Sequence, residues 1–275
     1  MNLLVIGDVM GKPGRRVLAA HLPRLREHLQ LDLVVANGEN ADDGGAGITP
    51  AAAQELFALG IDVLTNGNHA WDKREALSYI EREPRLLRPH NYPPGTPGSG
   101  WYVAQAGERR VGILNIMGTA FMQPTLGCPF RAADDALSAK PDDVNVVLVD
   151  FHAEATMEKW AFGWYLDGRV SAVVGTHTHV PTADERVLPG GTAYISDIGM
   201  TGCYDSVIGL EIQKTLKRMV HKLPERFEPA EGNATLCAVL IDVDEASGKS
   251  HSIRRLALDE MDAVNPARIL AKAVA

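Results

Sequence analysis

LLVIGD, residues 3–8, is a run of four apolar residues that ends in a glycine and an aspartate. Such a short apolar run predicts a buried strand, which places the aspartate at the strand's carboxyl end. Ligands of open α/β sheets bind in the crevice beyond these ends. Four further predicted strands end in polar residues in the same way. They are Leu33–Ala36 before Asn37-Gly38-Glu39-Asn40, Val63–Thr65 before Asn66-Gly67-Asn68-His69, Val146–Val149 before Asp150-Phe151-His152-Ala153-Glu154, and Ala172–Gly175 before Thr176-His177-Thr178-His179.

Amphipathic segments alternate with these strands and predict a layered α/β fold. The expected helices cover residues 13–29, a segment opened by Thr49-Pro50, and residues 73–81, 154–165 and 210–222. The remaining expected strands are a hairpin of 101–106 with 110–116, a short strand at 194–196, and two last strands at 235–243 and 250–256. Residues 85–100 are rich in proline and glycine and predict a loop. Because no repeat or linker interrupts the pattern, we expect one domain over residues 1–275.

Composition and charge limit the partners. The chain has 275 residues, 45% of them hydrophobic, which is enough for a sizeable core. The formal net charge of -8 disfavours a general polyanion binder, because such proteins usually carry a basic stripe. The first predicted helix carries Arg15, Arg16, Arg24 and Arg26. This helix could contact RNA, but a solvated surface face explains the arginines better, and a homo-oligomer stays open.

Cysteine usage and the N-terminus indicate the compartment. The three cysteines, Cys128, Cys203 and Cys237, are far apart and odd in number, which favours reduced thiols. The first apolar run is too short for a signal sequence and lacks a basic flank. No stretch approaches the roughly 18 apolar residues of a membrane span. We therefore expect a cytoplasmic protein that makes no use of a membrane.

Several common catalytic motifs are excluded by spacing. Gly7–Lys12 is one residue short of a Walker loop and is followed by Pro13 instead of serine or threonine. Gly7, Gly11 and Gly14 do not form the dinucleotide fingerprint, and no Gly-x-Ser-x-Gly elbow occurs. Gly44–Gly47 is better explained as a flexible rim loop than as a phosphate cradle.

The polar strand ends favour a metal site when they are taken together. Asp8 alone could be a helix cap, Asn66-Gly67-Asn68 a turn, and His152 a hydrogen-bonded surface histidine. His177 and His179 are harder to explain in this way. Alternate positions on an extended segment point both rings to one side, and imidazole is a common ligand of zinc, iron and copper.

The donor types indicate the metal and the reaction. Mixed oxygen and nitrogen donors suit manganese, iron or zinc better than magnesium or calcium. No cysteine belongs to the set, which excludes a structural zinc finger. With two anionic ligands and several neutral ones, two divalent ions would leave the site positively charged. That surplus charge can hold a hydroxide and an anionic phosphate, so the sequence predicts phosphoryl chemistry.

The ordered motifs resemble those of a known enzyme family. The series Gly7-Asp8, Gly38-Glu39-Asn40, Gly67-Asn68-His69, His152 and Gly175-Thr176-His177-Thr178-His179 resembles the calcineurin-like metallophosphoesterases. Over nearly its full length the chain is similar to their bacterial YmdB-like branch. The resemblance implies a four-layered αββα sandwich and a metal-dependent phosphodiesterase of cyclic nucleotides, 2′,3′-cyclic and also 3′,5′-cyclic.

The sequence departs from the wider family's pattern at three positions. Met10 replaces the histidine of the usual Asp-x-His, Glu39 replaces an aspartate, and Ala70 replaces an acidic residue. These departures fit the narrower branch, in which Asn40 would take up coordination beside Asp8. They leave open which metal is preferred, with iron or manganese expected and zinc as the alternative.

The resemblance also implies roles for individual residues. One ion would be held by Asp8, Asn40 and His179, and the other by Asn68, His152 and His177, with Glu39 bridging the two at a separation of ~3.5–4 Å. A hydroxide bridging the ions would attack phosphorus. His69 would protonate the leaving oxygen as general acid, and Asp42 would orient His69, although a solvated loop charge explains Asp42 equally well.

Two other functions stay open at this point. A phosphomonoesterase could use the same site, and a nucleotide-sensing regulatory protein could bind with little turnover. The apolar residues Met117, Phe121, Met122 and Cys128 lie in a predicted rim loop. They could line a base pocket or form a subunit contact, and the sequence does not decide between these.

Overall fold

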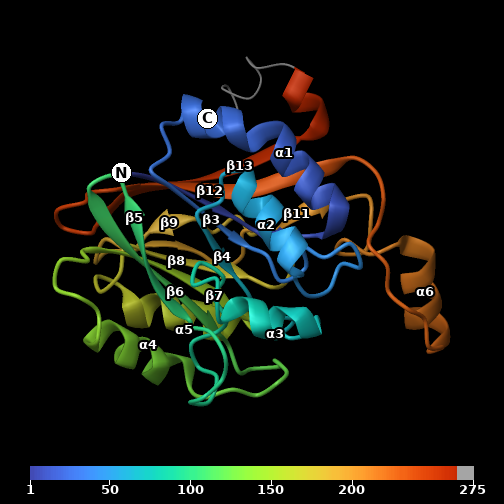
Figure 1. Cartoon of the computed structure of the whole chain (residues 1–275), viewed down its shortest axis with the longest axis horizontal. Helices are drawn as coiled ribbons and strands as arrows, with labels where there is room; N and C mark the ends of the chain where they lie inside the picture. The colour runs from blue at the N-terminus through green and yellow to red at the C-terminus, as the bar shows by residue number, and fades with distance from the viewer. Residues whose placement is uncertain (265–275) are drawn as a thin grey trace.

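The computed structural model of the chain describes residues 1–264 and contains two β-sheets covered by helices (Figure 1). The first sheet has seven strands, in the order β2-β11-β12-β1-β3-β4 with β13 paired to β12. The second has six strands, in the order β5-β6-β7-β8-β10-β9. The predicted single domain over residues 1–275 includes residues 265–275, which lie outside the described part, and it stays a prediction.

The first sheet combines three parallel strands from the N-terminal part with an antiparallel C-terminal pair. β1 pairs in parallel with β3, and β3 with β4, so their carboxyl ends lie at one edge. β12 pairs antiparallel with both β1 and β13. The strands are β1 (Asn2–Ile6), β2 (Asp8–Val9), β3 (Leu33–Asn37), β4 (Val63–Thr65), β11 (Met200–Cys203), β12 (Ala234–Val243) and β13 (Ser250–Asp259).

The second sheet has a parallel centre and two antiparallel edges. β6, β7, β8 and β10 run parallel, so their carboxyl ends share an edge. The hairpin partner β5 and the short β9 complete it. The strands are β5 (Trp101–Ala106), β6 (Arg109–Met117), β7 (Val146–His152), β8 (Ala172–Thr176), β9 (Arg186–Val187) and β10 (Ala193–Ile195).

Helices cover the outer faces of both sheets (Figure 1). α1 and α2 lie over the first sheet, whereas α4 and α5 lie over the second. α6 projects from the side of the molecule (Figure 1). The helices are α1 (Gly11–His28), α2 (Pro50–Ala58), α3 (Arg74–Ile80), α4 (Pro129–Ser138), α5 (Thr156–Leu166), α6 (Ile212–His221) and a 3₁₀ helix, η1 (Glu260–Val264).

Alternation along the strands divides the core into three layers. In β1, Leu4 and Ile6 pack in the cluster shared with α1 and α2, whereas Leu3 and Val5 pack in the cluster between the two sheets. A third cluster joins the second sheet to α4 and α5. Successive side chains of a strand point to opposite faces, so a central strand such as β1 contributes to two of these layers. The predicted four-layered αββα sandwich is therefore confirmed.

Most predicted elements are present, and the missed ones are short except α4, a helix of ten residues. Thr49 caps α2 by accepting a hydrogen bond from Ala52 N at 3.3 Å, as its sequence predicts. The sequence does not predict β2, β9, β11, α4 or η1. β2 and β9 have only two residues each, which is too few for a pattern of apolar residues to reveal.

Arg15, Arg16 and Arg26 of α1 form ion pairs within the molecule. The side chain of Arg15 is buried and pairs with Asp43 at 2.8 Å and Glu55 at 2.7 Å, so the predicted solvated face is wrong for this residue. Arg16 pairs with Glu260 at 2.7 Å. Residues 1–264 contain no helix with both the length and the hydropathy of a membrane span.

Candidate metal centre

Five strand ends meet at one place in the molecule. Asp8 begins β2, Glu39 follows β3 and Asn68 follows β4 in the first sheet, whereas His152 ends β7 and His177 follows β8 in the second. The backbone N–H of His177 donates to Asp8 Oδ2 at 3.2 Å, which connects the two sheets directly. The site therefore lies where the carboxyl ends of both sheets come together.

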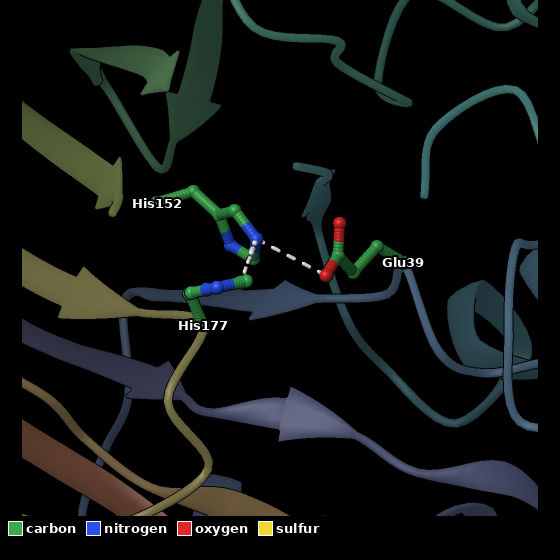
Figure 2. A group of neighbouring side chains, drawn as sticks. All are labelled: Glu39, His152 and His177. Atoms are coloured by element: carbon green, nitrogen blue, oxygen red, sulfur yellow. Dashed lines mark hydrogen bonds and ion pairs between the residues drawn. The ribbon is translucent and has the colours of Figure 1, made fainter. Parts of the chain in front are cut away.

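Glu39, His152 and His177 form a group of potential metal ligands (Figure 2). One donor atom from each lies within 4.8 Å of the others. His152 Nε2 is 3.1 Å from Glu39 Oε1 and 3.1 Å from His177 Nδ1. Figure 2 shows the three side chains converging from separate segments. These three residues could hold a metal ion.

The surroundings of His152 test whether this donor set suits a cation. Asn68 Oδ1 lies 3.0 Å from His152 Nε2, in addition to Glu39 and His177. Three atoms that carry lone pairs, one each from Asn68, Glu39 and His177, thus surround His152 Nε2. A proton on one histidine nitrogen can satisfy only part of the set, whereas a cation is attracted by every member. The donor chemistry fits a metal ion.

A second group of donors lies beside the first. Asp8 Oδ1 is 3.9 Å from His179 Nε2 and 4.0 Å from His152 Nδ1. Asp8 is fully buried, and this oxygen has no hydrogen-bond partner among the described residues. An unpartnered buried carboxylate oxygen is costly, and a neighbouring cation would remove that cost. Asn40 Nδ2 lies 3.1 Å from His179 Nε2, so as a ligand Asn40 would turn its amide to present Oδ1.

Burial and mutual charge shift the pKa values of these groups. Burial raises the pKa of Asp8 to about 6, against the opposing charges of His179 and His152. Burial acts on Glu39 in the same direction, but the charge and hydrogen bond of His152 bring its pKa down to about 2. Burial alone would lower the pKa of His152, but Glu39 raises it to about 9. Burial, with the charge of His152, lowers the pKa of His177 to about 3.

His177 and His179 each use their second ring nitrogen for a fixed partner. His177 Nε2 lies 3.2 Å from Glu154 Oε2. His179 Nδ1 lies 2.7 Å from the carbonyl oxygen of Ile208, to which it donates. Such contacts orient an imidazole and select its tautomer, so the other nitrogen faces the site with its lone pair.

Thr176 and Asp150 fix His152 in the same manner. Thr176 Oγ1 donates to Asp150 Oδ1 at 2.7 Å and lies 2.9 Å from His152 Nδ1. Since its hydrogen is used by Asp150, the hydroxyl oxygen accepts from His152 Nδ1–H. The lone pair of the neutral ring is then on Nε2, the nitrogen that faces Glu39.

The segment after β8 turns instead of continuing as a strand. β8 ends at Thr176, and His177 and His179 have φ angles of 101° and 65°. The expectation that an extended segment points both rings to one side is therefore wrong. Positive φ is uncommon for residues other than glycine and is concentrated at functional sites. Here the turn directs His177 toward His152 and His179 toward Asn40.

Glycine allows one loop to approach the site closely. A Cβ atom at Gly67 would lie 2.0 Å from Cδ2 of His152, so a side chain cannot be accommodated there. The missing Cβ lets the backbone that carries Asn68 reach the histidine.

His69 contacts a different carboxylate from the one that the sequence predicts. Its backbone N–H donates to Glu39 Oε2 at 3.0 Å, and its Nδ1 lies 2.7 Å from Asp72 Oδ2. Asp42, the predicted partner, instead pairs with Lys73 Nζ at 2.5 Å. The carboxylate that contacts His69 is thus Asp72 and not Asp42.

A cavity of about 590 Å³ opens over these residues. Its lining consists of Met10, Glu39, Asn40, Gly44, Gly45, Ala46, His69, Glu154, His177, Thr178, His179, Val180, Ile208, Leu210 and Phe227. The glycine-rich segment thus contributes to the rim, as its sequence predicts. Residues 117–128 do not line this cavity, so the base-pocket alternative for them is wrong here. Met117 belongs to β6 and is buried, as is Met122, whereas Phe121 is 89% exposed.

The sequence alone assigns no role to Asp72, Asp150, Glu154 or Thr176. Alternation along β7 could have found Asp150, because it shares a strand face with His152. The spacing of Asp72, three residues after His69, is also short enough for contact within one turn. The partner of His179 is the backbone carbonyl of Ile208, which the sequence cannot reveal because every residue has such a group.

Known proteins resemble this chain in sequence and in structure. The model of the YmdB-like protein family matches residues 4–256. A 2′,3′-cyclic-nucleotide 2′-phosphodiesterase from Bacillus subtilis is 45% identical over 260 residues, which cover 94% of this chain and 98% of that protein. The predicted resemblance to such an enzyme is confirmed.

Two crystal structures share the fold over almost the whole length. A hypothetical protein from Thermus thermophilus superposes with a TM-score of 0.89 at 43% identity, covering 94% of this chain and 100% of that one. A phosphatase from Mycoplasma pneumoniae superposes with a TM-score of 0.88 at 33% identity, covering 94% and 93%. The family match, these relatives and the motifs at the strand ends show that the chain belongs to the YmdB-like protein family.

Proposed function

We propose that this chain is a metal-dependent phosphodiesterase that hydrolyses cyclic nucleotides, with 2′,3′-cyclic nucleotides as the main class and 3′,5′-cyclic ones as a further class. The observation that carries the proposal is the convergence of Glu39, Asn68, His152 and His177 beside a cavity of about 590 Å³. Such a volume is typical of pockets for small organic ligands. The 45% identity to the Bacillus subtilis phosphodiesterase supports the same class of substrate.

The donors suit two metal ions. Asp8, Asn40 and His179 would hold one, and Asn68, His152 and His177 the other, with Glu39 between them. Iron or manganese fits the mixed oxygen and nitrogen donors, with zinc as the alternative. When bound, two such ions supply an activated water and positive charge for the phosphate.

His69 would act as the general acid for the leaving oxygen. It lines the cavity, and its Nδ1 lies 2.7 Å from Asp72 Oδ2. The carboxylate holds the ring by Nδ1, which leaves Nε2 for the substrate. Asp72 is therefore a positioning residue in the proposed reaction.

Metal removal and replacement test the proposal. The protein is stripped with chelator, reloaded separately with Mn²⁺, Fe²⁺ or Zn²⁺, and assayed on 2′,3′-cyclic AMP, 3′,5′-cyclic AMP and 4-nitrophenyl phosphate. We expect the chelator to abolish hydrolysis and Mn²⁺ or Fe²⁺ to restore it, with the cyclic diesters preferred. Preference for the monoester would favour a phosphomonoesterase. Nucleotide binding without turnover, whatever the metal, would favour a sensing protein.

A further inference from the structure

One wall of the cavity is apolar. Met10, Val180, Ile208, Leu210 and Phe227 line it, on the same cavity as Glu39, His69 and the two histidines after β8. Ile208 is 49% exposed and Val180 is 55% exposed. Large apolar side chains left exposed beside a polar site indicate a surface that a ligand covers.

The wall is firmly connected to the metal centre. The Ile208 carbonyl accepts from His179 Nδ1 at 2.7 Å. The backbone after Ile208 is hydrogen-bonded to the segment that directly follows Phe227. Glu211 N donates to Glu228 O at 2.9 Å, and Ala230 N donates to Gly209 O at 2.8 Å.

The Phe227 ring itself is held from one side. The guanidinium of Arg218, on α6, stacks over the ring at 4.3 Å from its centroid. A cation–π contact of this kind restrains the ring and leaves its other face for contact. The wall thus has a fixed position relative to a phosphate held at the metal centre.

Charge limits what can occupy the wall. No lysine or arginine lines the cavity within residues 1–264. The adjoining hollow beyond Phe227 contains Lys12 and Arg226, but acidic groups outnumber them there. These acidic residues are Asp43, Glu228 and Glu231. Neither region favours a second phosphate, so the occupant is an uncharged group and not a further nucleotide of a longer chain.

We propose that this apolar wall is the nucleoside subsite, in which Phe227 stacks on the base of a mononucleotide whose only phosphate lies at the metal centre. The inference rests on the proposed function and adds the part of the substrate that the metal ligands do not recognise. The wall side chains offer no hydrogen-bonding group to a base edge. All four bases are therefore accepted, and purines are favoured through their larger stacking area.

Substrates with and without a base distinguish stacking by Phe227 from a general effect of this residue on catalysis. Phe227→Ala is compared with the unaltered protein on 2′,3′-cyclic AMP and on glycerol 1,2-cyclic phosphate, which has the same five-membered cyclic diester but no base. We expect kcat/KM for the nucleotide to fall ~5-fold or more, since stacking on an aromatic ring contributes at least that much per base. The value for the glycerol diester should not change.

Two variants serve as controls. Phe227→Tyr keeps the ring and should retain the nucleotide activity. Phe57→Ala removes another arginine-covered ring, since Arg85 lies 4.0 Å from the Phe57 centroid, but Phe57 does not line the cavity. Phe57→Ala should leave kcat/KM unchanged for both substrates. An equal loss on both substrates in Phe227→Ala, or no loss on either, would overturn the subsite.

A binding measurement distinguishes this inference from the proposed function. If the unaltered protein hydrolyses neither diester, the proposed phosphodiesterase activity fails. Calorimetry with Mn²⁺-loaded protein then compares adenosine 3′-monophosphate with inorganic phosphate. The subsite requires the nucleotide to bind more tightly, and Phe227→Ala to remove that difference. Equal affinity for both ligands would contradict the subsite even in an active enzyme.

Discussion

His152 Nε2 lies 3.1 Å from Glu39 Oε1, and this contact joins the two sheets of the molecule at the metal centre. His152 ends β7 in the second sheet, whereas Glu39 follows β3 in the first. Neither sheet alone supplies a complete donor set. The site therefore depends on the packing of one sheet against the other, which the apolar cluster between them maintains.

Glu39→Gln should lose bound metal and turnover together. The amide has nearly the size of the carboxylate but lacks the charge that balances a cation and that raises the pKa of His152 to about 9. Elemental analysis of reloaded protein and hydrolysis of 2′,3′-cyclic AMP measure the two effects. Glu245→Gln, at a surface carboxylate paired with Arg109 at 3.1 Å, is the matched control and should change neither. Full turnover in Glu39→Gln would show that the bridging role is misassigned.

Thr176→Val should weaken metal binding ~10–100-fold, the usual cost of removing a group that orients a ligand histidine. The change keeps the shape of the side chain but deletes the hydroxyl between His152 and Asp150. Mn²⁺ titration by calorimetry measures the affinity, and thermal unfolding measures any general loss of stability.

Thr65→Val provides the control for this prediction. The Thr65 hydroxyl also donates to Asp150, but in the described structure it makes no hydrogen bond to a site histidine. We expect its metal affinity to stay close to that of the unaltered protein. If both variants lose affinity equally, the hydroxyl matters through Asp150 and not through the tautomer of His152.

The sequence predicts the strand ends well because two signals coincide there. A buried apolar run followed at once by a polar residue fixes both the strand and the edge at which Asp8 or His152 lies. The parallel pairing of the central strands in each sheet then follows from the alternation of strands and helices. Together these signals account for the confirmed αββα fold.

The parts that sequence could not predict depend on turns and on the backbone. The partner of His69 is decided by the turn that brings Asp72 against it and leaves Asp42 with Lys73. The positive φ of His177 is likewise a property of tertiary context. The group that orients His179 is a carbonyl, which any residue at Ile208 would supply.

The metal-free protein should lose stability as pH rises from about 6.5 to about 9. Burial alone would lower the pKa of His152, but Glu39 raises it from 6.5 to about 9, so the folded chain holds this proton more tightly than the unfolded chain. The protonated His152 therefore contributes its full stabilisation of the folded state below pH 6.5, and this contribution is lost above about pH 9. Thermal unfolding of chelated protein across this range measures the effect. An unchanged pH dependence in His152→Gln would contradict the assignment.

Asp72→Asn should slow turnover while metal binding is retained, because the amide no longer offers two equivalent carboxylate oxygens to hold the His69 ring by Nδ1. His69→Ala should be slower by ~10²–10⁴-fold, the usual contribution of one general acid. Asp42→Asn, which disturbs the pair with Lys73 and the hydrogen bond from Gly44 N but no contact to His69, should keep nearly full activity. Steady-state rates with 2′,3′-cyclic AMP, together with metal content, decide between the two aspartates. A larger loss in Asp42→Asn than in Asp72→Asn would restore the role that the sequence predicts for Asp42, and metal loss in His69→Ala would make His69 a ligand.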